Sequence, residues 1–402
     1  MTGNRANRVL MIVENNNVPS DRRVWQEAEA LRDAGYEITI ICPRTPEASR
    51  FRETDGRIQI IRHPRVIEAE QPWQYGLEYA NAMFWQVLLS LIVLATNGVD
   101  VVHIANPPDA AFVVGGLLRL FGTRVVFDQH DLSPEVYEAK FGRRGFLWRA
   151  LLLFERASYR VAHIVITTNN SIKQIAIERG GRQPNDVFVV RNGPKVNPHT
   201  PITAMGAVEV ERRFTVCYMG IIGAQEGLDG LVRVIDDIVT SRARTDVRFV
   251  IIGDGTGLQA LKKEVSCRGL DDHVTFTGYL SGELFWETLN SADVCVSPEP
   301  GTALNDRSTL VKVMDYMALA KAVVQYDLTE ARVTAGDTAM YATPDDEHDL
   351  ADKILYLLDH PELRRDLGAR AAERVRTALA WQHQVPHLIE AYAATLNGHR
   401  HG

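Results

Sequence analysis

The sequence predicts an α/β protein made of two doubly wound parallel-sheet domains that face each other across a cleft. Apolar, β-branched runs alternate with helical patterns along the whole chain, which is typical of βαβ units and parallel sheets. The alternation pauses once, between residues 192 and 213, where the chain holds Pro and Gly but no strand-like run. The length of 402 residues is enough for two cores of this kind.

The strands and domains follow in order from this pattern. In the first half the expected strands are Val9–Val13, Ile38–Cys42, Ile58–Ile61, Val99–Ile104, Val125–Phe127, Ile164–Thr167 and Val187–Val190. In the second half they are Val216–Met219, Phe249–Ile252, Val274–Thr277, Val294–Ser297, Val323–Tyr326 and Met340–Ala342. The expected units are a domain of residues 1–195, a linker of 196–213, a domain of 214–380 and a C-terminal helix, 381–402, that could cross back to the first domain.

Composition and charge exclude several classes of protein. The chain is 46% hydrophobic and 24% charged, which is typical of soluble globular proteins, and its formal charge of −7 gives no overall basic field for a nucleic acid. Cys42, Cys217, Cys267 and Cys295 form no CxxC pair, so free thiols in a reducing compartment are expected. The N-terminus lacks the apolar core of a secretory signal, and the apolar heart of residues 79–99 is too short for a membrane span. We expect a cytoplasmic protein in which residues 79–99 form a buried helix.

The first βα turn, residues 14–21, is not a GxGxxG, which counts against a nicotinamide or flavin site. Asn17 and its neighbours tolerate left-handed backbone and offer amide groups, so the turn could approach a ligand at a helix N-terminus. An ordinary βα turn capped by Ser20 or Asp21 explains the same residues.

A glycine-rich turn, Gly253–Gly257, follows the strand Phe249–Ile252 and precedes a helix. Strand, glycine turn and helix form a geometry in which backbone N–H groups meet a phosphate or a nucleoside. Tight packing of the turn is the alternative interpretation. A P-loop NTPase is excluded, because no Lys-Ser pair follows.

The segment 303–317 combines a helix start with charged side chains. Ser308 or Thr309 is expected to cap a helix that runs to about Ala320, with Arg307 and Lys312 beside its positive end, an arrangement that would suit a diphosphate. Asp315 lies three residues after Lys312, hence on nearly the same helix face, where a carboxylate could bind sugar hydroxyls. A solvated Lys312–Asp315 pair is the alternative.

His130 lies between Asp128 and Asp131 at the end of an apolar strand, where side chains face the cleft and act on ligands. A loop histidine with satisfied hydrogen bonds is the alternative, and one His between carboxylates is weak evidence for a metal. Because no Asp-x-Asp occurs in the chain, we expect no catalytic divalent ion.

The segment Lys140–Arg149 mixes four cations with large apolar side chains at a helix start. Such a patch could contact an anionic membrane surface, although a solvated helix start has the same composition.

Motifs in order along nearly the whole chain resemble those of glycosyltransferase family 4, retaining enzymes of the GT-B fold with two Rossmann-like domains. These motifs are Pro19–Val24 with Glu27, Ala28 and Leu31, Asp128–Glu135, Glu155–Ala157 with Ile164–Thr167, Arg191–Gly193, Tyr218–Gly220, Gly253–Gly255, Phe276–Tyr279, Ala292–Val294 and Lys312–Ala318. The resemblance implies a metal-independent hexosyltransferase without a cofactor, with a role such as polysaccharide biosynthesis. Its nucleotide-sugar donor, of the UDP or GDP type, would be held by the C-terminal domain. Its acceptor, a glycan, a lipid-linked molecule or a small molecule, would be held by the N-terminal domain.

The resemblance also implies roles for single residues. His130 would lie beside the donor sugar, the segment Gly278–Leu280 would meet the base, and Asp315 would bind the ribose. The start of the helix near Ser308 would receive the diphosphate, and front-face attack assisted by that diphosphate would retain the anomeric configuration. The expected catalytic residues are His130 and Asp131, and the expected donor-binding residues are Asn17, Gly220, Gly223, Gly253, Gly278, Tyr279, Leu280, Arg307, Ser308, Thr309, Lys312 and Asp315.

Two departures from the family pattern keep other functions open. The family commonly has two Glu eight positions apart, where this chain has Arg307 and Asp315, and the usual Arg and Lys after Gly220 are replaced by Ile221–Gly227. A non-catalytic GT-B protein that binds a nucleotide or a partner would fit these losses. A GT-B nucleotide-sugar 2-epimerase would share the fold.

Overall fold

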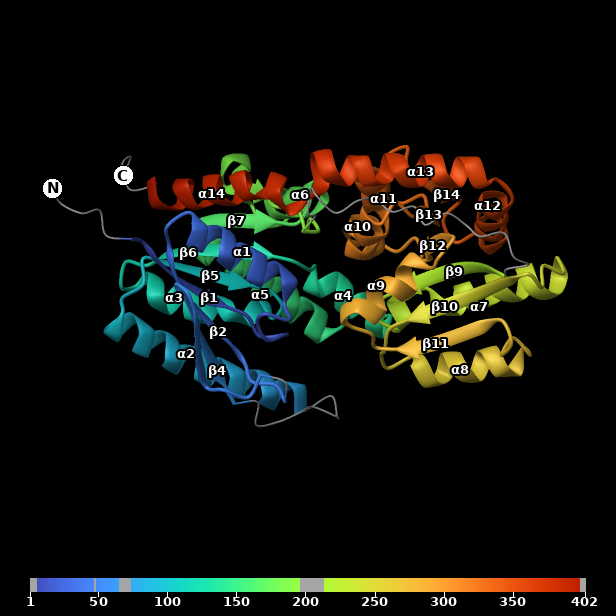
Figure 1. The fold of residues 1–402 in the computed structure, drawn as a ribbon. Helices are drawn as coiled ribbons and strands as arrows, with labels where there is room; N and C mark the ends of the chain where they lie inside the picture. The colour runs from blue at the N-terminus through green and yellow to red at the C-terminus, as the bar shows by residue number, and fades with distance from the viewer. Residues whose placement is uncertain (1–5, 47, 65–73, 196–212, 398–402) are drawn as a thin grey trace. The chain divides into compact units, whose positions relative to one another are not determined.

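The computed structural model describes residues 6–46, 48–64, 74–195 and 213–397. The chain divides into two compact units, one of residues 1–192 with 384–402 and one of residues 193–383 (Figure 1). The expected linker, 196–213, lies outside the described residues except for Arg213. The last helix, α14 (Trp381–Asn397), contributes residues 384–397 to the first unit.

The first unit contains an eight-stranded sheet in the order β3-β4-β2-β1-β5-β6-β7-β8. Its strands are β1 (Arg8–Ile12), β2 (Glu37–Pro43), β3 (Arg52–Asp55), β4 (Ile58–His63), β5 (Val101–Ala105), β6 (Arg124–Gln129), β7 (Ile164–Thr167) and β8 (Val187–Val189). All pairings are parallel except that of β3 with β4. The sequence analysis missed β3, because its four residues are all exposed and carry no apolar signal.

Helices cover both faces of this sheet. They are α1 (Arg22–Asp33), α2 (Gln74–Thr96), α3 (Phe112–Arg119), α4 (Ser133–Phe141), α5 (Phe146–Val161), α6 (Asn170–Glu178) and the short helices η1 (Asp109–Ala111) and η2 (Pro184–Asp186). Alternate residues of a strand point to opposite faces. Val102 and Ile104 of β5 accordingly pack with α2, α3 and α5, whereas His103 contacts α1 and α14 on the other face.

Two local expectations are settled in this unit. Asp21, not Ser20, caps α1, because its Oδ1 accepts a hydrogen bond from the Val24 N–H at 3.0 Å. The expected buried helix at residues 79–99 is only half buried, since Leu89 faces the core while Phe84 and Ile92 are exposed. Among the helices of the described residues, none has the length and apolar character needed to cross a bilayer.

The second unit contains a six-stranded parallel sheet in the order β11-β10-β9-β12-β13-β14. Its strands are β9 (Phe214–Met219), β10 (Val247–Ile252), β11 (Val274–Gly278), β12 (Val294–Ser297), β13 (Ala322–Tyr326) and β14 (Met340–Ala342). Its helices are η3 (Ala224–Glu226), α7 (Leu228–Asp236), η4 (Asp237–Ser241), α8 (Leu258–Cys267), α9 (Gly282–Asn290), η5 (Asn305–Arg307), α10 (Val311–Ala318), α11 (Thr329–Ala335), α12 (Glu347–Asp359), α13 (Pro361–Arg374) and η6 (Val375–Leu379). Separate apolar cores lie on the two faces of this sheet.

The four cysteines are free thiols, as expected, and three of them are buried in strands. Burial raises the pKa of Cys217 to about 12, so this thiol is not a nucleophile at neutral pH.

Candidate active site

His130 directly follows β6, and two residues fix its position. Its backbone N–H donates to Oδ1 of Asn106 at 2.6 Å, and Asn106 in turn donates through Nδ2 to the Asp131 carbonyl at 2.9 Å. Because Asn106 follows β5, this side chain ties two neighbouring strand ends together. The His130 ring forms an ion pair through Nε2 with Asp128, and its side chain is 14% exposed. Asp131 is exposed at the same loop.

Asp128 belongs to a buried charge cluster that the sequence analysis did not predict. Arg23 of α1 binds this carboxylate with both arms, Nε to Oδ2 at 2.9 Å and Nη2 to Oδ1 at 2.6 Å. Burial alone would raise the pKa of Asp128, but the charges of Arg23 and His130 lower it well below its ordinary value. Asp128 is therefore ionised, and its carboxylate fixes the position of the His130 ring.

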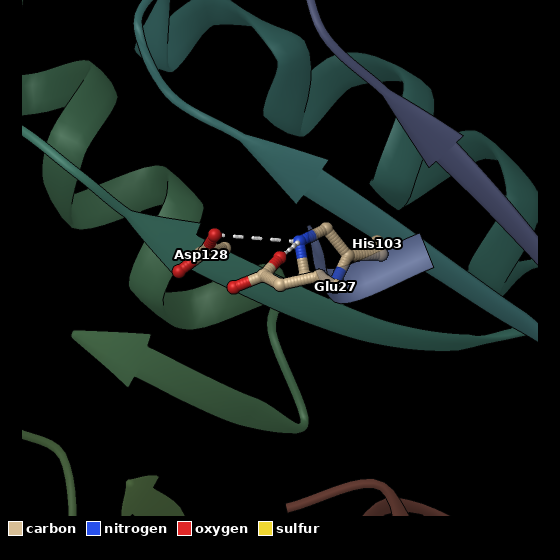
Figure 2. Close-up of side chains that lie close together, drawn as sticks. All are labelled: Glu27, His103 and Asp128. Carbon is tan, nitrogen blue, oxygen red and sulfur yellow. Dashed lines mark ion pairs between the residues drawn. The ribbon is translucent and has the colours of Figure 1, made fainter. Parts of the chain in front are cut away.

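Glu27, His103 and Asp128 lie together within this cluster (Figure 2). The Nε2 atom of His103 is 3.3 Å from Oε2 of Glu27 and 3.5 Å from Oδ2 of Asp128, and one ligand atom from each residue lies within 4.8 Å of the others. Burial raises the pKa of Glu27 well above its ordinary value and lowers that of His103, and both shifts favour the neutral form of the group.

Arg23 already supplies the positive charge that a metal ion would bring to these ligands. Its Nη2 atom lies 3.1 Å from Oε1 of Glu27 and 2.6 Å from Oδ1 of Asp128. The Arg23 guanidinium balances the ionised Asp128 carboxylate, while the pKa shifts of Glu27 and His103 favour the neutral forms of those two groups. The arrangement therefore suits the positioning of His130 better than the binding of a cation.

A second polar group lies where β1 and β4 end. Oε2 of Glu14 contacts Nε2 of His63 at 3.1 Å and accepts a hydrogen bond from Nε2 of Gln86 at 2.5 Å. Asn17 follows in the same turn, donates to Thr45 at 2.5 Å and keeps a buried Oδ1 without a hydrogen-bond partner among the described residues. The only sign of this group in the sequence is Gln86, a polar residue within an apolar helix.

In the second unit, Lys312 of α10 lies at the ends of β9 and β12. Its Nζ contacts Oε2 of Glu226 at 2.9 Å, the Tyr218 hydroxyl at 3.0 Å and the carboxylate of Glu299. Burial alone would lower the pKa of Lys312, but these oxygens raise it well above its ordinary value, so the ammonium stays charged. The alternative of a solvated Lys312–Asp315 pair is wrong, because Lys312 is only 11% exposed and is held by two other carboxylates.

The glycines expected to approach the donor also pack against one another. A Cβ at Gly253 would lie 1.8 Å from the Gly220 carbonyl oxygen. The Gly220 N–H donates to Ile252 at 3.0 Å, and the Gly253 N–H donates to Gly278 at 3.0 Å. Tight packing therefore accounts for Gly220 and Gly253, whose N–H groups are engaged within the sheet.

The start of α10 differs from the expectation. The helix begins at Val311 after an N-cap at Leu310, with no side-chain cap, and ends at Ala318 rather than Ala320. Ser308 does not cap it, because its hydroxyl donates to the Leu304 carbonyl at 2.8 Å, and Thr309 precedes the N-cap. The first N–H groups of α10 thus have no side-chain acceptor at the N-cap, beside the charged Lys312.

The remaining expected donor residues surround this region of the second unit. Arg307 ends η5 just before the helix, and Asp315 is buried within α10. Tyr279 and Leu280 follow β11, where the Tyr279 ring is exposed and Leu280 packs on the core. Gly223 precedes η3, where an added Cβ would meet only the Ile221 side chain, at 3.9 Å.

Comparison with known proteins assigns both units to one family. The family model for "Glycosyltransferase Family 4" matches residues 20–196, and the model for "Glycosyl transferases group 1" matches residues 213–360. The chain belongs to glycosyltransferase family 4. The resemblance drawn from the sequence motifs is thereby confirmed.

Several curated relatives of this glycosyltransferase share parts of its sequence. An α-D-kanosaminyltransferase of Streptomyces kanamyceticus is 30% identical over 165 residues, which are 40% of this chain and 41% of that enzyme. The mannosylfructose-phosphate synthase of Agrobacterium fabrum is 20% identical and the match covers 89% of this chain and 82% of the relative. The phosphatidyl-myo-inositol mannosyltransferase of Mycolicibacterium smegmatis is 23% identical, with coverage of 88% and 84%.

Solved structures confirm the fold class. The sucrose-phosphate synthase of Thermosynechococcus elongatus matches with a TM-score of 0.77 at 19% identity, covering 96% of this chain and 98% of that one. Anabaena HepE in complex with UDP-glucose matches with a TM-score of 0.69 at 15% identity, covering 96% and 99%. The glycosyltransferase therefore has the GT-B fold, with two parallel-sheet α/β domains.

Proposed function

We propose that this glycosyltransferase moves a hexose from a UDP- or GDP-type sugar donor to a hydroxyl of a glycan, lipid-linked or small-molecule acceptor, with retention of anomeric configuration. In this proposal the donor binds the second unit and the acceptor binds the first. The transfer needs no metal ion and no cofactor. The structural relative HepE is complexed with UDP-glucose, and two sequence relatives are a mannosyltransferase and a mannosylfructose-phosphate synthase, which supports this donor class.

The observation that carries the proposal is the start of α10 beside Lys312. The N-terminus of a helix presents N–H groups and a positive partial charge, which together stabilise an anion such as a diphosphate. Leu310 offers no side-chain cap there, and Lys312 keeps its charge despite burial. In the proposed reaction these groups and Arg307 stabilise the leaving diphosphate, which itself assists attack of the acceptor from the front face.

We propose that His130 lies beside the donor sugar during transfer and that Asp128 acts as its positioning residue. The bidentate Arg23 contact fixes the Asp128 carboxylate, and the carboxylate fixes the His130 ring through Nε2. Such support from a second residue orients a group without touching the substrate. The polar group of Glu14, His63 and Gln86 supports an acceptor that carries hydroxyls, because these side chains donate and accept hydrogen bonds.

We further propose a cytoplasmic location with peripheral contact to the inner membrane face through Lys140–Arg149. In this segment Phe141, Arg143, Arg144, Phe146 and Leu147 are exposed.

Product analysis tests the transferase proposal. The chain is incubated with a hexose donor of each nucleotide type and a panel of sugar and lipid-linked acceptors, and NMR reads the anomeric configuration of any product. The proposal expects one donor to yield a product with the donor's configuration and to do so in the presence of EDTA. An inverted product, or turnover that EDTA abolishes, would contradict the corresponding part of the proposal.

One observation favours nucleotide binding without transfer as a second candidate. Glu226 and Glu299 place two carboxylates on the single charge of Lys312, which leaves this position with an excess of negative charge. A diphosphate must compete with those carboxylates. A chain that binds a nucleoside diphosphate yet transfers no sugar across the acceptor panel would support this candidate.

A further inference from the structure

We infer that the outer face of α5 docks on a bilayer of anionic phospholipid and that the hollow beside it receives a phosphate-bearing headgroup. The inference deepens the membrane contact of the proposed function, on which it rests, by naming the partner and the surface. It does not depend on sugar transfer.

The surface is built on one stripe of α5, formed by Phe146, Arg149, Leu153, Arg156 and Arg160. Their spacing of three and four residues places all five on one side of the helix. All five are exposed, Phe146 at 83% and Leu153 at 64%. We call these residues the α5 stripe.

The charges of the α5 stripe are uncompensated. In the described part of the chain, the guanidinium groups of Arg149, Arg156 and Arg160 have no hydrogen-bond or ion-pair partner. The buried Glu155 of the same helix pairs instead with Arg179, at 2.6 Å. Three unpaired cations are thus concentrated on one helix face of a chain whose net charge is −7.

Apolar side chains extend this surface beyond the α5 stripe. Arg119 at the end of α3 donates to the Val161 carbonyl at 2.8 Å, which brings the end of α3 against the end of α5. Leu120 and Phe121 follow Arg119 and are 81% and 62% exposed. At the other end of α5, Phe141 and Leu147 are also exposed. So many exposed large apolar side chains close together mark an interaction surface rather than a solvated helix face.

The hollow lies along the α5 stripe and has a volume of about 660 Å³. Leu153, Arg156 and Arg160 line it together with Arg182 and Glu178. Arg182 is held in place on one side of the hollow, because it donates to the carbonyls of Tyr159 in α5 and of Ala162 and His163 just after it. Glu178 accepts a hydrogen bond from Gln174 at 2.6 Å. The unpaired Arg156 and Arg160 are therefore the groups that a phosphate would meet.

An anionic bilayer would bind both the arginines and the apolar side chains of this surface. Arginines bind phosphate groups at the interface while Phe and Leu enter the boundary of the acyl chains. A symmetric contact through this surface would bring the three arginines of one copy close to the three arginines of the other, where like charges repel. The chemistry of the surface therefore favours the bilayer over self-association.

Co-sedimentation of the full chain with vesicles tests the inference. We expect binding to vesicles of phosphatidylcholine mixed with phosphatidylglycerol, weak binding to phosphatidylcholine alone, and a loss of binding as the salt concentration rises. The double variant Arg149→Glu/Arg156→Glu should bind the mixed vesicles at least about tenfold more weakly. The control Lys263→Glu/Arg365→Glu makes the same charge change at exposed helix positions of the second unit and should bind like the wild type.

Two further variants separate the apolar and headgroup parts of the surface. Leu153→Ser should reduce binding to mixed vesicles and leave the residual binding more sensitive to salt. Arg160→Gln should weaken binding to the mixed vesicles and leave the weak binding to phosphatidylcholine alone unchanged. Because these positions are exposed, equal melting temperatures of the variants and the wild type will show that folding is unchanged.

Three outcomes would overturn the inference. These are equal binding to both vesicle types, wild-type binding by the Arg149→Glu/Arg156→Glu variant, and a dimer that Leu153→Ser dissociates without any vesicle binding. Sugar transfer to a soluble acceptor without vesicles is measured in parallel and should be unchanged in the double variant. Absent transfer with intact vesicle binding would contradict the proposed reaction alone, and intact transfer with absent vesicle binding would contradict the docking alone.

Discussion

Replacement by the amide should lower the free energy of unfolding at one of the two buried carboxylates beside Arg23, Asp128, and should not lower it at the other, Glu27. Asp128→Asn leaves the Arg23 guanidinium without its bidentate partner, and breaking a buried ion pair costs about 3–5 kcal/mol of unfolding free energy. Burial raises the pKa of Glu27 well above its ordinary value, which favours the protonated acid, and Glu27→Gln replaces that acid with a neutral amide of nearly the same shape. We expect that variant to be at least as stable as the wild type at pH 7.

The pH dependence of stability determines the sign and size of the difference expected between Glu27→Gln and the wild type. Above the ordinary pKa of Glu27, 4.5, the unfolded chain has lost the proton that the folded chain retains. Wild-type stability then falls as the pH rises, by up to about 1.4 kcal/mol per pH unit for this group, until the folded pKa is reached. Glu27→Gln removes this loss of stability. The difference in unfolding free energy between the variant and the wild type should therefore grow, in favour of the variant, from pH 5 to pH 7.

Urea unfolding of both variants at pH 5, 6, 7 and 8 measures these differences. Glu37→Gln, at an exposed position of β2, is the control and should show a difference that does not vary with pH. If Glu27→Gln costs about 3 kcal/mol or more at pH 7, as Asp128→Asn is expected to, then Glu27 is ionised. The assignment of charges in the cluster would then be wrong.

Three further predictions concern the second unit. Glu226→Gln removes one carboxylate that competes for Lys312 and should tighten binding of a nucleoside diphosphate several-fold in calorimetry, and weaker binding would show that Glu226 assists the donor. Gly253→Ala places a Cβ 1.8 Å from the Gly220 carbonyl and should cost about 2 kcal/mol or more in urea unfolding. Gly223→Ala, whose Cβ would meet only a side chain at 3.9 Å, should cost less than about 1 kcal/mol, and equal losses in the two variants would refute the packing argument.

Local patterns were sufficient to predict most of the fold. The apolar runs gave nearly all strand positions to within about two residues, because buried parallel strands are continuous apolar segments. The strand β3 was missed because Arg52–Asp55 pairs only at the sheet edge and buries no side chain. The predicted cap of α10 was wrong because the Ser308 hydroxyl donates to the Leu304 carbonyl instead. The path of the chain before the helix, which the sequence pattern does not show, sets this contact.

The candidate site was predictable only in part, because its contacts join distant segments. Lys312 was a candidate from its place in a helix, but its partner Glu226 comes from η3 and its partner Glu299 from the loop after β12. Glu27 and His103 come from α1 and β5, and no spacing in the sequence joins them to Asp128. The signal that could have been used is His103 itself, a polar residue in the otherwise apolar strand Val101–Ala105.

The most direct test of the proposed donor site is the thermal stability of the wild type and of Lys312→Met against UDP, GDP, ADP, CMP and dTDP. The account predicts that one nucleoside diphosphate at about 100 times its dissociation constant raises the wild-type melting temperature by several degrees, and raises that of Lys312→Met by much less. A wild type that no nucleotide stabilises, or a Lys312→Met variant stabilised as much as the wild type, would contradict a diphosphate site at the start of α10.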